Sequence, residues 1–92
     1  MYLEIVSPEA TLFSGNVEAV TVPGVNGEFQ MLENHAPVVS ILQQGTVKIK
    51  GNLTIDEAYA ERFTKAGNGD TLLAINSGTL EMNDNKIIVL AD

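Results

Sequence analysis

Pro23 to Gly45 reads PGVNGEFQMLENHAPVVSILQQG and holds the strongest indications of the fold. Pro23-Gly24 suits the central positions of a type II turn, because proline presets the first φ and glycine accepts a positive one. Asn26-Gly27 is the strongest short hairpin signal in the chain. The residues that follow, Glu28 to Leu32, alternate polar and apolar, which predicts a strand. Tight turns followed by alternation indicate β structure.

Similar turn residues divide the rest of the chain into short segments of strand-forming sequence. Gly15-Asn16 predicts a two-residue hairpin, and residues 83–85, Asn-Asp-Asn, predict another because their side chains tolerate left-handed backbone. The alternation within each segment predicts which apolar side chains face inward. Glu18 lies on the same face as Val20 and Val22 but nearer solvent. The predicted inward residues are Val20, Val22, Phe29, Met31, Val47 and Ile49. The predicted strands are Tyr2–Val6, Thr11–Phe13, Val17–Val22, Glu28–Leu32, Val38–Leu42, Thr46–Lys50, Thr71–Ile75, Thr79–Met82 and Lys86–Leu90.

Residues 51–70 do not fit this pattern. Helix-forming residues fill 56–63, where Asp56 is a candidate cap and Tyr59 and Phe63 stand four apart on one helical face. The alternative is a strand from Ala58 to Thr64, because aromatic residues and threonine favour strands. We expect the strand, since an isolated helical turn is poorly stable. Residues 67–70, Gly-Asn-Gly-Asp, predict the turn that follows.

Eight or more short strands predict an all-β fold, a small antiparallel β-sandwich or flattened barrel of about eight to ten strands. Ninety-two residues suffice for one core, so we expect one domain over residues 1–92. There is no cysteine, which excludes disulfides and thiol chemistry. Neither a signal peptide nor a membrane-spanning run is present in this sequence, whose longest apolar run is Ile87–Ala91.

The formal net charge is -7, and no Lys or Arg precedes Lys48. Nucleic-acid binding requires clustered cations, so it is not expected, and attraction to anionic lipid is disfavoured for the same reason. An acidic first half suits a protein partner that presents Lys or Arg. The alternative is that the charge only keeps a small domain soluble.

His35 is the sole histidine and the first candidate for chemistry. With Glu33 it supplies two metal ligands where zinc requires three or four, so no metal or other cofactor is expected. Ser40 lies nearby but in no nucleophile motif, and the glycines match neither a phosphate-binding nor a dinucleotide-binding pattern. We therefore expect no small-molecule substrate. His35 is better explained as fixing the loop before Pro37 or as lying at a protein interface.

Several separated motifs resemble the epsilon subunit of F-type ATP synthase, called delta in mitochondria. The central motif, P-G-x-x-G-x-x-x-x-L-x-x-H-A-P followed by leucine and glycine, is similar to Pro23–Pro37, Leu42 and Gly45. The opening LEIVSPE and the segment TLFSG resemble the first strands of that family. The ending SGTLEMNDNKIIVLAD resembles its last hairpin. The resemblance covers nearly all of the chain apart from residues 51–70, which are longer than the usual connection.

The resemblance implies a β-sandwich without enzyme activity of its own, which links the gamma subunit to the c-ring and couples proton flow to ATP synthesis. By position, Gly27, Glu28 and Phe29 correspond to the part that meets the c-ring. The residues that correspond to the gamma contact are Ser7, His35, Ala36, Pro37 and Val38. The implied location is the cytoplasmic face of a bacterial inner membrane, as a peripheral part of the complex.

In that family the chain usually continues into a pair of inhibitory helices. The sequence stops at Asp92, so we expect these helices to be absent. Two other interpretations remain open. One is a generic β-sandwich binding module unrelated to ATP synthase. The other is a small hydrolase built on Glu28, Glu33 and His35, which would lose activity on replacement of His35.

Overall fold

Ten strands and one short 3-10 helix form most of the computed structural model, which describes residues 1–92. The elements are β1 (Tyr2–Val6), β2 (Thr11–Asn16), β3 (Ala19–Gly24), β4 (Gly27–Leu32), β5 (Val38–Leu42), β6 (Gly45–Lys50), η1 (Glu57–Arg62), β7 (Phe63–Lys65), β8 (Thr71–Ile75), β9 (Gly78–Asn83) and β10 (Lys86–Ala91). The bounds predicted for β1, β5 and β8 are those observed.

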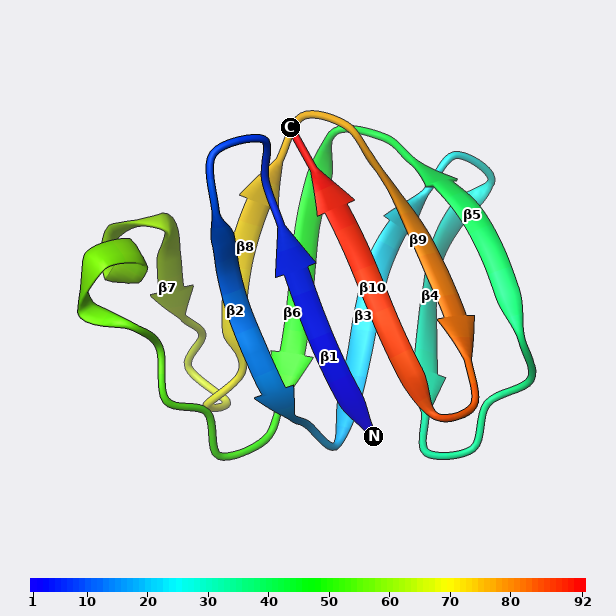
Figure 1. Ribbon diagram of the computed structural model, residues 1–92, viewed down its shortest axis with the longest axis horizontal. Helices are drawn as coiled ribbons and strands as arrows, with labels where there is room; N and C mark the ends of the chain where they lie inside the picture. The colour runs from blue at the N-terminus through cyan, green and yellow to red at the C-terminus, as the bar shows by residue number, and fades with distance from the viewer.

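The strands curl into two layers (Figure 1). The front layer contains β2, β1, β10, β9 and β5, and behind it lie β4, β3, β6 and β8, with β7 beyond β8. The layers join at one corner, where Gly24 of β3 pairs with Leu42 of β5. The predicted all-β sandwich or flattened barrel is therefore confirmed. One strand pair departs from the antiparallel expectation, because β1 runs parallel to β10.

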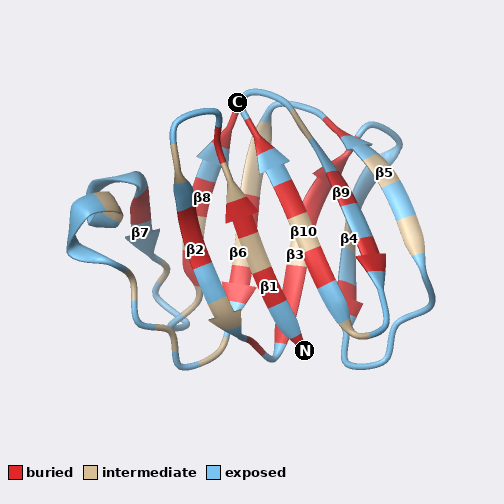
Figure 2. Ribbon diagram, in the orientation of Figure 1, coloured by how far each residue is buried: buried red, intermediate tan, exposed pale blue.

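A core of 20 buried residues fills the space between the layers. Buried and exposed positions alternate along the strands, as Figure 2 shows for β1, β10 and β9. Val20, Val22, Met31, Val47 and Ile49 are completely buried as predicted, whereas Phe29 is half-buried and packs against the edge of the core. The period-2 pattern thus identified the inward faces correctly.

The hairpin predicted at Gly15-Asn16 is wrong. Both residues belong to β2, where they pair with Leu3 and Tyr2 of β1. The chain then crosses from the front layer to the back layer, so β2 and β3 are not neighbours. Val17 is buried at this crossing, and its amide donates to the carbonyl of Met1 at 2.8 Å.

The type II turn predicted at Pro23-Gly24 is also wrong, although the Asn26-Gly27 signal does mark a hairpin. Pro23 and Gly24 end β3, the turn residues are Val25 and Asn26, and Gly27 has the positive φ of 121°. Gly24 is required for packing instead. A Cβ there would lie 2.9 Å from both the Gly27 carbonyl oxygen and the Phe29 ring.

The strand expected from Ala58 to Thr64 is wrong over most of its length. Residues Glu57–Arg62 form η1, and β7 begins only at Phe63. The Asp56 side chain accepts a hydrogen bond from the Ala58 amide at 2.9 Å, which is the capping role the sequence suggested for a helix. Capping and the packing of Tyr59 against the core outweigh the weak intrinsic stability of so short a helix.

Two predicted turns are confirmed. Asp84 and Asn85, with φ of 50° and 62°, connect β9 to β10 in left-handed conformations. In the turn before β8, Gly69 has a φ of 92°, and the Asn68 side chain accepts from the Asp70 amide at 3.0 Å. Asn and Asp tolerate positive φ because their short side chains form local hydrogen bonds.

Candidate docking surfaces

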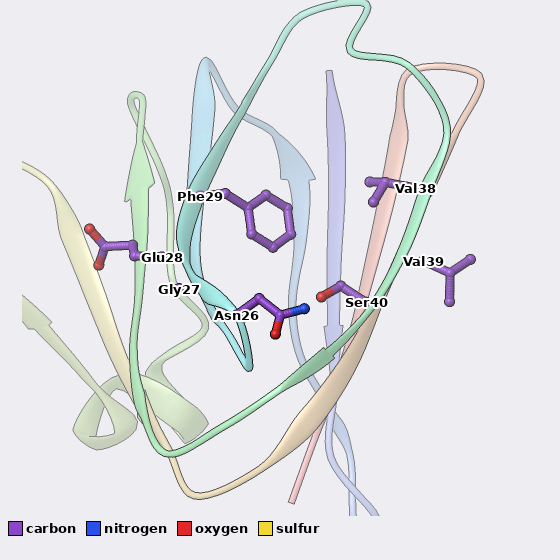
Figure 3. Close-up of a pocket in the computed structure, with 8 residues that line it drawn as sticks. Asn26, Gly27, Glu28, Phe29, Val38, Val39 and Ser40 are labelled. Carbon is purple, nitrogen blue, oxygen red and sulfur yellow. The ribbon is translucent and has the colours of Figure 1, made fainter.

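The tip of the β3–β4 hairpin carries the residues predicted to meet a ring, Gly27, Glu28 and Phe29. Glu28 and Phe29 point to opposite sides of β4 (Figure 3), as successive residues of a strand must. The Glu28 carboxylate lies 3.2 Å from the Lys48 ammonium group of β6, and both side chains are about half exposed. An exposed ion pair contributes only about 0–1 kcal/mol. Glu28 can therefore exchange Lys48 for a cation on a partner at little cost.

A shallow groove of about 330 Å³ separates this hairpin from β5. Its walls include Gly24, Asn26 and Phe29 on one side and Val38 and Ser40 on the other. The Phe29 ring is directed into this space in Figure 3. The groove thus brings together Phe29 and Val38, which the sequence assigned to two different contacts.

The loop after β4 is fixed by a set of long-range hydrogen bonds. Glu33 Oε1 accepts from the Asn85 side-chain amide at 2.9 Å and from the Met1 amino group at 3.2 Å. Asn85 Oδ1 in turn accepts from the Asn34 amide at 2.8 Å, which supports the positive φ of Asn34. Hydrogen bonding by Asn85, then by the amino terminus, lowers the pKa of the Glu33 carboxyl group. The predicted contact loop is therefore preorganised.

His35 is exposed within this loop and holds only local contacts. Its Nδ1 lies 2.7 Å from the Ala36 carbonyl oxygen, which can only accept, so Nδ1–H donates this hydrogen bond. Its backbone amide donates to the Leu32 carbonyl at 3.1 Å, which closes the turn. Ala36 and Pro37 are exposed beside it. His35 thus fixes its own loop and presents a ring edge to solvent.

Ser7, predicted to contact the same partner as His35, lies elsewhere. It follows the end of β1, whereas His35 follows the end of β4 at the opposite end of the sandwich (Figure 1). Ser7 is only 5% exposed, and its hydroxyl lies 3.2 Å from the Ala10 carbonyl oxygen inside its own turn. A partner that touches both positions must extend along the front layer.

The outer face of the front layer carries an apolar patch that lies between these two positions. Val39, Ile41 and Leu90 are 77%, 64% and 51% exposed. Strand register joins them, because Thr79 of β9 pairs with both Ile41 and Leu90. Sequence reasoning missed these residues. The signal was the mainly apolar character of residues 38–42, interrupted only by Ser40, which indicates that both faces of the strand carry apolar residues.

Carboxylates border this apolar patch. Glu81 pairs with Val39 on one side and with Ile88 on the other, and Glu4 pairs with Ile88 from β1. Neither Glu4 nor Glu81 forms a salt bridge. The face therefore offers apolar contacts together with unpaired negative charge.

The residues of the hydrolase interpretation are not assembled into a site. Glu28 is near the start of β4 and paired with Lys48, whereas Glu33 follows the end of β4 and is bonded to Asn85. Glu28 and Glu33 are five residues apart along extended backbone, about 17 Å. No group of three or more His, Asp or Glu side chains is placed to hold a metal ion. The one helix, η1, is too short and too polar to cross a membrane.

The whole chain, residues 1–92, matches the family model described as the ATP synthase delta/epsilon chain, beta-sandwich domain. The chain belongs to this family. Membership excludes the interpretation as an unrelated sandwich module. Because the match includes residues 51–70, the resemblance is wider than the sequence motifs indicated. This delta/epsilon chain domain is therefore recognised over its full extent, including η1 and β7.

Curated relatives named ATP synthase epsilon chain agree with this membership. The relative from Campylobacter curvus is 36% identical over 92 residues, and that from Campylobacter fetus is 38% identical. The chain covers 60% of each of these relatives, so it spans about three fifths of their length. The relative from Chlorobaculum tepidum is 34% identical over 90 residues, and 86% of its length is covered.

Solved structures show the same fold at low sequence identity. A chain of the Tetrahymena thermophila mitochondrial ATP synthase central stalk and c-ring structure superposes with a TM-score of 0.69 at 14% identity. The match covers 99% of this chain and 62% of that one. A chain of the Euglena gracilis mitochondrial ATP synthase gives 0.71 at 18% identity, with 97% and 48% covered. Both likenesses concern the fold of the β-sandwich.

Proposed function

We propose that this delta/epsilon domain is a non-catalytic docking part of the rotor of a proton-translocating F-type ATP synthase, joining the gamma subunit to the c-ring. The observation that carries the proposal is the family match over all 92 residues. The complex would place the domain at the cytoplasmic face of a bacterial inner membrane. Residues 1–92 would act as one docking domain.

The geometry supports two contacts on different parts of the sandwich. The hairpin tip with Gly27, Glu28 and Phe29 would meet the c-ring, with Glu28 exchanging Lys48 for a cation of the ring. The preorganised loop with His35, Ala36, Pro37 and Val38 would meet gamma. Glu28 lies at the start of β4 and His35 follows its end, so the length of this strand separates these two side chains, whereas Phe29 and Val38 line one groove.

The gamma contact would continue from that loop onto the front layer. Val39, Ile41 and Leu90 offer an exposed apolar surface, and Glu81 offers a charge partner for Lys or Arg. Ser7 contributes little surface of its own and would only border this contact. Buried apolar anchors with a charged rim are the usual composition of a stable protein interface.

The mechanical role would follow from packing. Torque passes between two partners without slip only if the part between them does not deform. A close-packed core of 20 side chains between two bonded layers has low compressibility. The domain would therefore transmit rotation as a rigid wedge and needs no cofactor or small-molecule substrate for this role.

The proposal is tested by using the chain as bait in a detergent extract of membranes that contain the intact complex. Recovery of gamma and ring subunits supports it. Repeated failure, with the intact complex present in the extract, contradicts it. Ile41→Asp should reduce recovery of gamma, whereas Thr46→Asp, on the back layer, should not, because only Ile41 lies in the apolar patch.

A second test concerns the ring contact. Glu28→Lys reverses the charge at the hairpin tip and places two cations side by side at Lys48. Proton-coupled ATP synthesis in membranes should fall, while Lys48→Ala, which removes the internal partner and leaves Glu28 free, should retain it. Unchanged coupling and assembly in Glu28→Lys would remove Glu28 from the proposed contact.

A further inference from the structure

The outer edge of β4 is an unpaired strand edge. β4 pairs with β3 along its whole length and with no other strand. β5 follows β4 in the chain but belongs to the front layer, where it pairs with β9. The turn before β4 is bonded to β5, since the Val25 amide donates to the Ile41 carbonyl at 3.1 Å, but β4 itself is not paired with β5. An open seam therefore runs between β4 and β5.

Alternate backbone groups of β4 point away from β3, toward the free edge. The Pro23 carbonyl accepts from the Gln43 amide at 2.9 Å, so Pro23 faces away from its β4 partner, Glu28. Antiparallel ladders alternate between bonded and non-bonded pairs. The pair of Thr21 and Gln30 is therefore also non-bonded, and the N–H and C=O groups of Glu28 and Gln30 point to the free edge.

Leu32 also belongs to a non-bonded pair, because it lies two residues after Gln30. Its carbonyl already accepts from the His35 amide, whereas its own N–H points outward with those of Glu28 and Gln30. All three residues are exposed, and no other strand pairs with β4 on this side. It contains no proline, lysine or bulge, which are the usual devices that block strand addition.

The opposite side of the sandwich, at β2, is covered by another segment of the chain. Thr54 and Asp56 lie beside Thr11 to Ser14 of β2, and Leu53, Ile55 and Tyr59 pack against the core. The segment 51–62 thus covers that side. The chain closes one side of its own sandwich and leaves the β4 side available.

Charge identifies the kind of partner that fits. The strands around the seam, β3, β4, β5 and β9, carry Glu28 and Glu81 and contain no Lys or Arg. Lys48 of the next strand, β6, forms an exposed ion pair with Glu28, whereas Glu81 has no such partner. A second copy of this chain, with a formal net charge of -7, would be repelled. An extended segment with Lys or Arg is complementary.

We propose that the free edge of β4 accepts an extended basic segment of a partner protein as an added β-strand. Its backbone would bond to the outward groups of Glu28, Gln30 and Leu32. Its inward side chains would be apolar and enter the groove beside Phe29 and Val38, and its outward side chains would be cationic and lie near Glu28. This mode of binding uses main-chain bonds for affinity and alternate side-chain pockets for specificity. It does not depend on which rotor subunits the domain meets.

The test uses an end-blocked heptapeptide, Lys-Val-Lys-Val-Lys-Val-Lys, and the isolated 92-residue chain after its folding has been verified by amide dispersion in an NMR spectrum. Binding should slow hydrogen exchange of the Gln30 amide at least about tenfold. A peptide N-methylated on its alternate edge-facing amides should bind about tenfold more weakly, because it loses the main-chain bonds. Equal binding of the two peptides, or protection confined to other strands, would overturn the proposal.

A matched pair of variants tests the same edge from the protein side. Gln30→Pro removes the outward N–H without breaking the β3–β4 ladder and should weaken peptide binding about tenfold. Gln30→Val removes the same side chain but keeps the N–H, and should retain affinity within about threefold. Equal affinities of the two variants would contradict strand addition. If Gln30→Pro does not fold, the comparison of the plain and N-methylated peptides tests the proposal instead. Sedimentation that shows a dimer sealed along β4 would assign the edge to a second copy and overturn the proposal.

Discussion

The Asn85 side chain bridges the tip of the β9–β10 hairpin and the loop after β4, with its Nδ2 2.9 Å from Glu33 Oε1 and its Oδ1 2.8 Å from the Asn34 amide. The two segments are 52 residues apart in the chain. Through this one side chain the C-terminal hairpin fixes the loop that presents His35.

Asn85→Gly should loosen that loop. Glycine accepts the positive φ of 62° without strain, so the change removes two side-chain hydrogen bonds without straining the turn and also makes the unfolded chain more flexible. The free energy of unfolding should fall by roughly 1 kcal/mol. Hydrogen exchange of the Asn34 amide should rise more than that of the core strands. Unchanged exchange at Asn34 would show that the bridge does not fix the loop.

Stability should depend on pH through Glu33. The hydrogen bond from Asn85 lowers its pKa below the ordinary value of 4.5, so in acid the unfolded chain binds this proton more readily than the folded chain. The contribution is fully present above about pH 5 and is lost as pH falls through the lowered pKa. The free energy of unfolding, measured against pH, should differ between wild type and Glu33→Gln at pH 7 and become similar in acid. Parallel curves would contradict this assignment.

Met31→Ala and Leu32→Ala test the register of β4. Met31 is completely buried and Leu32 is 55% exposed, although they are adjacent. Met31→Ala should lower the free energy of unfolding by about 2–5 kcal/mol, because it removes core contacts and leaves a cavity. Leu32→Ala should change it by about 0.5 kcal/mol or less. Chemical denaturation distinguishes these values, and a reversed order would mean that the strand is shifted by one residue.

Gly78→Ala and Gly67→Ala test two glycines of different kinds. A Cβ on Gly78 would lie 2.5 Å from the Leu90 carbonyl oxygen, in the backbone of the paired strand. That substitution should destabilise the chain by roughly 1–3 kcal/mol. A Cβ on Gly67 meets nothing within 4 Å, so Gly67→Ala should be neutral or slightly stabilising. Similar thermal stability of the two variants would contradict the close approach of β9 and β10.

Much of the fold was predictable because alternation is a local property of each strand. The inward faces of β3, β4 and β6 and the all-β class followed from it. The errors came from interactions across the sequence. Gly15-Asn16 forms no hairpin because the chain changes layers after β2, and Gly24 is a glycine because Phe29 packs on it. η1 is stabilised by the Asp56 cap and by core packing, which sequence preference alone does not weigh.

Sequence motifs supplied the residues of the proposed contacts but not their arrangement. Sequence motifs indicated Glu28 and His35, yet only the strand between them shows that they lie at opposite ends of β4. The partner of Glu33 was not predictable, since Asn85 was identified only as a turn residue. The exposed patch of Val39, Ile41 and Leu90 is formed by strands from distant parts of the chain, which register alone brings together.

Site-directed cross-linking in the assembled complex tests most directly whether this domain joins two different rotor partners. The chain has no cysteine, so each introduced thiol is unique within it. Two exposed positions are used, Asn26 at the hairpin tip and Ala36 in the loop beside His35. Asn26→Cys and Ala36→Cys are made separately, and each thiol receives a photoreactive label. The label at position 26 should join a ring subunit, and the label at position 36 should join gamma. Attachment of both labels to the same subunit, or of neither in an active complex, would contradict the proposed function.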